Sequence, residues 1–178
     1  AFAQLHKATG EERYAEATRR TFQHIMERWD NPKARWNKAH AGSRDMRALA
    51  PSMILCNLLL EIEHLIEPQL VEESIEKALG DVMNDFYRPE LGLVVEHMNA
   101  DGTLSDTFDG RLINPGHTLE TMWFVMDLAR RRGDEELIRK AVEIGLNTLD
   151  FGWDKEHGGI FYFMDRKGCP PQQLEWDQ

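Results

Sequence analysis

Residues 86–94 read Phe-Tyr-Arg-Pro-Glu-Leu-Gly-Leu-Val, and they join the end of a helical pattern to a strand-like one. A similar order, Trp-Asp-Lys-Glu-His-Gly-Gly-Ile-Phe, returns 67 residues later at residues 153–161, and residues 29–36 form a degenerate third copy. Each copy closes a pair of helices with a short hairpin. Because one such unit is too small to bury its own apolar face, repeated units stack into a solenoid or close into a ring. The sequence therefore predicts an all-α fold of helix pairs capped by short β-hairpins, with the hairpins at one end.

Apolar periodicity predicts three helices before this stretch. The Thr-x-x-Glu pattern at residues 9–12 has the spacing of a capping box, so a helix is predicted from there to Trp29. A second helix is predicted over residues 45–66, where Pro51 requires a kink or a restart. The third is predicted over residues 68–86.

The second half of the chain alternates between strand and helix patterns. Strands are predicted at residues 91–98 and 158–164, where apolar residues lie next to turn signals. A helix over residues 114–132 follows from its first two residues, because Asn suits the N-cap and Pro suits the first helical position. One more helix is predicted over residues 134–151.

Composition limits the class of protein. A net charge of -10 argues against binding to nucleic acid, which depends on Lys/Arg patches. The longest apolar run, at residues 53–60, is too short to span a membrane. Cys56 and Cys169 form neither a disulfide framework nor a metal motif, which favours a reducing, cytoplasmic location. We expect residues 1–178 to be a single domain of a longer protein, truncated at both ends.

The most informative segment for chemistry is Gly-Arg-Leu-Ile-Asn-Pro-Gly-His-Thr-Leu-Glu at residues 110–120. His117 falls in the first turn of the predicted helix, and Glu120 lies on the same face three residues later. A histidine there can act as an acid/base catalyst, with Glu120 fixing its tautomer and ring direction. The alternative is a plain histidine at a helix start, paired with Glu120. No second histidine stands nearby at a metal-ligand spacing, so no metal site is predicted.

Several motifs in order carry a resemblance to a known family. They are Pro51-Ser-Met-Ile-Leu-Cys-Asn57, Gly110-Arg111, Asn114-Pro-Gly-His-Thr-Leu-Glu120, Trp123-Phe124, Gly152-Trp153-Asp154, His157-Gly-Gly-Ile-Phe-Tyr-Phe163 and Gln173-Leu-Glu-Trp176. Together they cover most of the chain and resemble the N-acylglucosamine 2-epimerases. The wider superfamily includes cellobiose 2-epimerases and aldose–ketose isomerases, which share the Gly-His-x-x-Glu core.

The resemblance implies an (α/α)6 barrel and the interconversion of N-acetylglucosamine and N-acetylmannosamine. In that family two histidines act on opposite faces of C2, one removing a proton and one returning it. His117 matches the first and Glu120 its acidic neighbour, while the second histidine would lie beyond Gln178. The resemblance implies no cofactor for the chemistry, and ATP as an effector that is not hydrolysed. A homodimer is compatible with this architecture.

Four residues are expected to bind the sugar. Arg111 matches an arginine of the family, and its guanidinium suits sugar oxygens or a developing enolate. Glu96 alternates with Val95 in a predicted strand and is expected to face the pocket. Asn114 and Trp176 belong to the motifs that carry the resemblance, and an aromatic face suits the C–H surface of a sugar.

Three alternatives remain open from sequence. A sister enzyme, either an aldose–ketose isomerase or a cellobiose-type epimerase, would share the chemistry and differ in its pocket. A non-catalytic helical-repeat module would keep the fold without the second histidine. A glycoside hydrolase of similar shape would need a pair of carboxylates, for which Glu96, Glu120 and Asp109 are the candidates.

Overall fold

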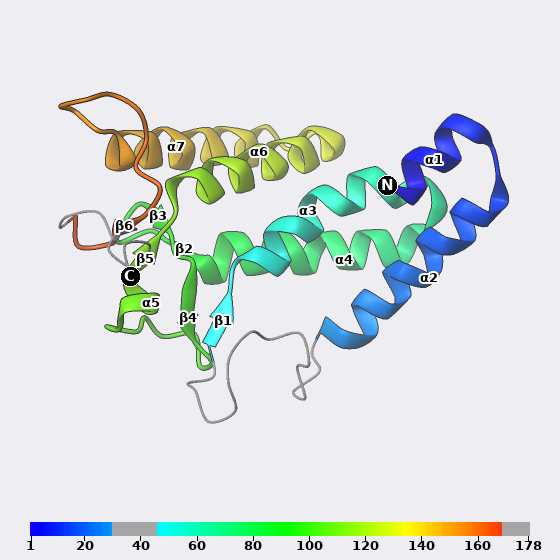
Figure 1. Ribbon diagram of the computed structural model, residues 1–178, viewed down its shortest axis with the longest axis horizontal. Coiled ribbons are helices and arrows are strands. Elements are labelled where there is room, and N and C mark those ends of the chain that lie inside the picture. The colour runs from blue at the N-terminus through cyan, green and yellow to red at the C-terminus, as the bar shows by residue number, and fades with distance from the viewer. Residues whose placement is uncertain (30–45, 169–178) are drawn as a thin grey trace.

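The computed structural model describes residues 1–29 and 46–168. Most of the degenerate repeat copy at residues 29–36 lies outside these ranges, as do Cys169 and Trp176. Three helix pairs organise the described chain: α1 (Phe2–Thr9) with α2 (Glu12–Trp29), α3 (Ala50–Ile62) with α4 (Pro68–Gly80), and α6 (Pro115–Arg132) with α7 (Glu135–Gly152). Figure 1 shows α6 beside α7 and α3 beside α4, with α1 and α2 at the edge where the chain starts.

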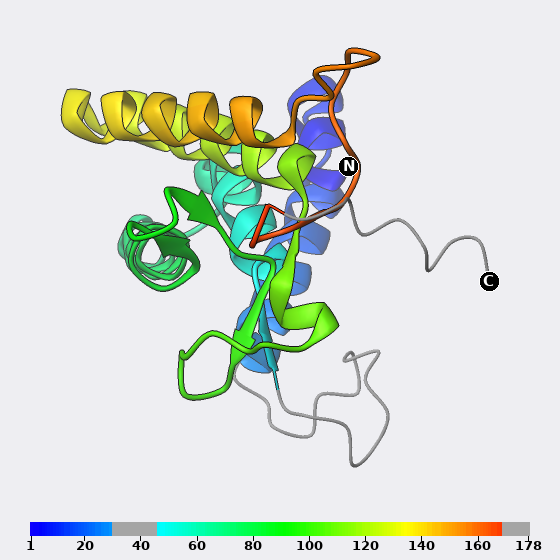
Figure 2. The ribbon, with the colours of Figure 1, turned by 90° about the vertical axis from the view of Figure 1, so that its left-hand side faces the viewer.

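Short elements connect these pairs. They are a 3-10 helix at Glu63–Leu65, a π-helical turn at Asp81–Phe86, strands β1 (Met46–Ala48), β2 (Tyr87–Arg88), β3 (Leu93–Val94), β4 (His97–Asn99), β5 (Leu112–Ile113) and β6 (Met164–Asp165), and the four-residue helix α5 (Phe108–Arg111). The strands form three antiparallel pairs: β1 with β4, β2 with β3, and β5 with β6. Figures 1 and 2 show that α5 and the strands gather at one end of the helix pairs, where α6 begins.

Both complete copies of the repeat form hairpins, as predicted. In the first, Tyr87 pairs with Val94 across the β2–β3 turn. In the second, Trp153 and Ile160 form an isolated antiparallel bridge. Each hairpin follows the last turn of a helix, so the repeated sequence corresponds to a repeated local structure.

Two predicted boundaries were wrong. The helix predicted over residues 45–66 begins only at Ala50, because residues 46–48 pair with β4 and Pro51 occupies the first turn of α3. The capping box at residues 9–12 does not form as predicted. Thr9 ends α1, where its hydroxyl donates to Leu5 O (2.8 Å) and accepts from Glu11 N (3.2 Å).

The predicted strand at residues 158–164 was also too long. It is reduced to the bridge at Ile160 and the two residues of β6.

The apolar core lies between the second and third helix pairs. Its fully buried side chains include Leu55, Leu59, Ile75, Leu128 and Ile144. Cys56 belongs to it, and burial raises the pKa of its thiol to about 12. Among the described helices, none is long and apolar enough to cross a bilayer.

Ion pairs tie the third helix pair to the second at the end far from the hairpins. Arg131 contacts Glu63 and Glu72, both at 2.6 Å, and Arg132 contacts Glu72 at 3.1 Å and Glu76 at 2.7 Å. The positive charges lie in the last turn of α6, where they also complement the negative end of the helix dipole.

Replacing Gly152 with Ala is expected to destabilise the protein. An added Cβ would lie 2.6 Å from Pro115 Cγ and 2.7 Å from Pro115 Cβ, so the end of α7 could no longer pack against the start of α6. Overpacking of this kind costs about 1–3 kcal/mol. Urea unfolding of the full-length protein measures this loss, and a Gly152→Ala protein as stable as wild type would contradict the prediction.

Gly145→Ala is the matched control. It lies in the same helix, and its added Cβ would meet nothing closer than Leu119 Cδ2 at 3.9 Å. Because alanine is the better helix former, this change should leave the free energy of unfolding equal or higher by up to about 1 kcal/mol.

Candidate active site

The first turn of α6 holds His117 in place. The Asn114 side chain accepts a hydrogen bond from the His117 amide (3.1 Å), which confirms Asn114 as the N-cap. Asn114 is buried, while the imidazole of His117 remains 40% exposed. The cap therefore fixes the backbone of His117 and leaves part of its ring accessible.

Glu96 is the carboxylate that binds the ring of His117. Its Oε2 lies 3.1 Å from His117 Nδ1, although the two residues are 21 positions apart. Glu96 occupies a bend between β3 and β4, and its carbonyl accepts from the amide of Leu49 at the start of α3 (2.9 Å). Val95 and Glu96 lie between the two strands and not within one, and both residues are buried.

This pairing fixes the tautomer of His117. A carboxylate can only accept a hydrogen bond, so Nδ1 carries the proton and, in the neutral ring, Nε2 holds the free lone pair. The hydrogen bond to Glu96 raises the pKa of His117 above its ordinary value. Burial opposes this effect, and the charges of Glu96 and Glu120 add to it. The result is an oriented imidazole that can take up and release a proton.

Glu120 lies one turn further along α6 and is partly exposed. It acts on His117 through its charge, and within the described residues no hydrogen bond joins the two side chains. The tautomer and ring direction are thus set by Glu96, whereas the sequence had suggested Glu120 for this task. The local spacing that favoured Glu120 places it on the same helix as His117. The bend between β3 and β4 nevertheless brings the Glu96 carboxylate closer to the imidazole.

Arg111 is held by residues that the sequence analysis did not single out. Its Nε donates to Asp165 Oδ2 (2.8 Å), and its Nη1 lies 3.4 Å from Asp106 O. The bond to Asp165 raises the pKa of the guanidinium further. Asp165 pairs with a residue 54 positions earlier, and no local sequence pattern indicates that pairing.

The aromatic pair after Glu120 divides between core and surface. Phe124 is 4% exposed and packs in the core, whereas Trp123 is 58% exposed. The buried face of α6 runs through Thr118, Met122 and Val125, and Trp123 points away from it.

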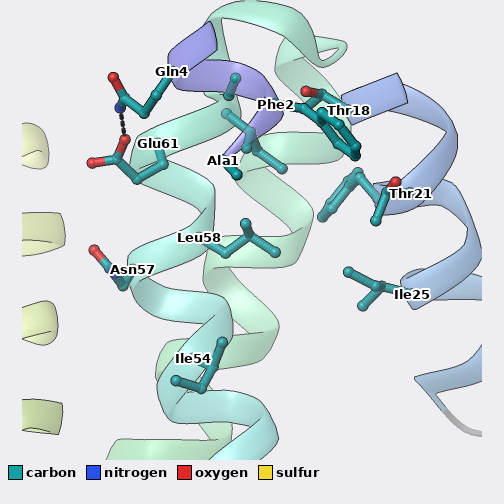
Figure 3. A pocket seen from close by; sticks show the side chains of 13 residues that line it. Ala1, Phe2, Gln4, Thr18, Thr21, Ile25, Ile54, Asn57, Leu58 and Glu61 are labelled. Atoms are coloured by element: carbon teal, nitrogen blue, oxygen red, sulfur yellow. Dashed lines mark hydrogen bonds between the residues drawn. The ribbon is translucent and has the colours of Figure 1, made fainter. Parts of the chain in front are cut away.

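A groove of about 560 Å³ lies elsewhere, between α1, α2 and α3. Figure 3 shows Leu58 of α3 and Ile25 of α2 on facing sides of it. Its lining includes no histidine, and its single carboxylate, Glu61, is bonded to Gln4. Its lining is largely apolar and its carboxylate is already bonded, so the chemistry favours the site at His117. Within residues 1–29 and 46–168, no cluster of three metal-ligating side chains occurs.

Comparisons with known proteins show the family of this chain. The family model for N-acylglucosamine 2-epimerase (GlcNAc 2-epimerase) matches residues 1–178. The curated N-acylglucosamine 2-epimerases of Mus musculus and Rattus norvegicus are 35% and 36% identical to this chain, over 99% of it and 43% of their own length. The Homo sapiens protein of the same name is 32% identical over 99% of the chain and 42% of its own length. The chain thus spans less than half the length of these relatives.

Solved structures show the same fold. A sugar epimerase from a ruminal bacterium matches 93% of this chain and 45% of its own, with a TM-score of 0.71 and 16% identity. A D-mannose isomerase matches 96% and 48%, with a TM-score of 0.69 and 17% identity. The predicted fold, helix pairs that form part of an (α/α)6 barrel, is confirmed. With the family model matched from end to end, this chain belongs to the N-acylglucosamine 2-epimerase family.

Proposed function

We propose that the protein is a sugar 2-epimerase that interconverts N-acetylglucosamine and N-acetylmannosamine. The observation that carries this proposal is the His117–Glu96 pair at the start of α6, in a chain that the family model matches throughout. The relatives that cover 99% of this chain are N-acylglucosamine 2-epimerases, which supports this substrate pair over other sugars.

In the proposed reaction His117 Nε2 removes or returns the proton at C2. The proton on C2 of the open-chain sugar moves to the Nε2 lone pair, and the electron pair of the C–H bond forms the C1–C2 double bond of an enolate, whose negative charge lies on the C1 oxygen. A second acid/base on the opposite face of C2 then returns a proton and inverts the carbon. Glu96 stabilises the imidazolium that forms, and Arg111 is the proposed donor to the developing oxyanion.

Two further residues have proposed roles in sugar binding. Asn114 holds the His117 backbone through the helix cap, and its position beside His117 supports a place at the edge of the sugar site. Trp176 is proposed as an aromatic surface for the sugar, and it lies outside the described residues.

We further propose that residues 1–178 form a single domain within such a barrel, in a cytoplasmic protein. ATP as an effector that is not hydrolysed, and a homodimer, are carried forward as proposals from the family resemblance. Adding ATP to the epimerisation assay and measuring the mass in solution test them directly.

Solvent deuterium incorporation tests the function. The full-length protein is incubated with N-acetylmannosamine in D₂O, and deuterium at C2 is followed by NMR together with the products. Deuterium at C2 with N-acetylglucosamine as product supports the proposal. A ketose product would favour the aldose–ketose isomerase instead, and no exchange with any sugar tested would favour the non-catalytic module.

A further inference from the structure

We propose that Asp165 is a positioning residue for Arg111, holding its guanidinium by Nε so that Nη2 is left as the donor to a sugar oxygen. This inference rests on the proposed function, because it concerns the binding side of the same site. Its basis is the set of contacts around the segment that leads into α6, which is called here the Arg111 loop (residues 105–111).

The first observation is the way in which Arg111 is bonded. Its Nε donates to a carboxylate whose side chain is only 8% exposed, and its Nη1 contacts the Asp106 backbone and, at 3.7 Å, the Asp106 carboxylate. Within the described residues no hydrogen bond is made by its Nη2, and the side chain is 29% exposed. A planar guanidinium held at two nitrogens presents the third in a fixed direction.

The second observation is that β6 reaches this loop from far along the chain. Leu112, directly after Arg111, pairs with Asp165 across β5 and β6, and Arg166 N donates to Arg111 O (2.8 Å). Asp165 Oδ1 also accepts from Lys167 N (2.9 Å), so one oxygen fixes its own turn while the other binds Arg111. The Asp165 carboxylate is therefore held in place by contacts other than the one to the Arg111 guanidinium.

The third observation is that the Arg166 side chain joins the two ends of the Arg111 loop. Its side chain is 11% exposed, and its Nη1 donates to Ser105 O and Gly110 O, both at 2.6 Å. Gly110 packs so closely that an added Cβ would lie 2.4 Å from Ser105 Cβ. The loop ahead of Arg111 is thus compact and bonded at both ends, which leaves the guanidinium little freedom.

The role of such a residue is to define geometry and not to touch the substrate. Displacing a binding group by about 1 Å can lower a rate by up to the order of 10²-fold, even when the chemical groups remain intact. Asparagine at position 165 keeps the shape but loses the charge that holds the guanidinium.

Kinetics of the full-length protein with N-acetylmannosamine test the proposal. Asp165→Asn is expected to lower kcat/KM by about tenfold, mainly through a lower kcat because Arg111 is the proposed donor to the developing oxyanion, with the pH dependence set by His117 unchanged. In an Arg111→Ala background, Asp165→Asn should have almost no further effect, because the group it positions is gone. If the losses in kcat/KM of Arg111→Ala and Asp165→Asn multiply in the double variant, the proposal is overturned. Wild-type kinetics in Asp165→Asn alone would also overturn it.

Asp101→Asn is the matched control. Asp101 accepts from Thr103 N (2.9 Å) in the same kind of turn, but no ion pair joins it to a cation of the described chain. Its replacement should leave kcat/KM within about twofold of wild type, as for a typical exposed site.

A measurement without substrate separates failure of this inference from failure of the proposed function. Hydrogen exchange at the Arg111 Nε–H, followed by NMR, should be slow in wild type and in Asp101→Asn compared with the exposed Arg139. Fast exchange in wild type would overturn the pairing even if Asp165→Asn fails to fold. If wild type shows slow exchange but does not epimerise the sugar, the function is wrong and the pairing stands.

Discussion

Replacing His117 with Asn is expected to abolish most of the C2 proton exchange of the full-length protein. Asparagine keeps a polar side chain of similar reach but cannot take up a proton, and acid/base groups contribute about 10²–10⁴-fold to such reactions. We therefore expect kcat/KM for N-acetylmannosamine to fall by about 10³-fold, with deuterium incorporation at C2 lost in parallel.

The control for this change is His24→Asn. His24 is exposed on α2, where it contacts Glu27 at 3.3 Å, and it should tolerate replacement with activity within about twofold of wild type. Wild-type exchange in His117→Asn would remove His117 from the mechanism, even if the protein proved to be an epimerase.

Replacing Glu96 with Gln is expected to lower the pKa of His117. The carboxylate stabilises the imidazolium, so its neutral replacement favours the uncharged ring. In the direction in which His117 acts as the base, the acidic limb of kcat/KM should move to lower pH. In the reverse direction, in which it must be protonated, the alkaline limb should also move to lower pH. Loss of ring orientation should reduce kcat by roughly 10- to 100-fold.

Two measurements check this prediction. An NMR titration of the His117 ring reports its pKa without any substrate, and pH profiles in both directions report its role in catalysis. Glu90→Gln is the control, because Glu90 is exposed in the turn of the preceding hairpin and should leave both profiles unchanged. A His117 pKa that stays the same or rises in Glu96→Gln would contradict the prediction.

Much of the fold could be predicted because its signals are local. The N-cap and proline of residues 114–115 gave the start of α6, and the prediction that it ends at residue 132 matches the structure. The repeated hairpins were also predicted, since their turn residues stand next to the apolar residues that they pair. The start of α3 was misplaced because strand pairing of Met46–Ala48 depends on β4, about fifty residues away. Local propensity does not record such a partner.

For the site, the sequence determined which residues have the right chemistry and where the helix presents them. His117 at a capped helix start, Glu120 beside it and Arg111 before it all follow from spacing along the chain. Only the tertiary structure decided that Glu96 binds the His117 ring and that Asp165 binds Arg111, 21 and 54 positions away. The physical reason is that neighbours in a helix follow from its period, whereas partners brought together by hairpins depend on how separate elements pack.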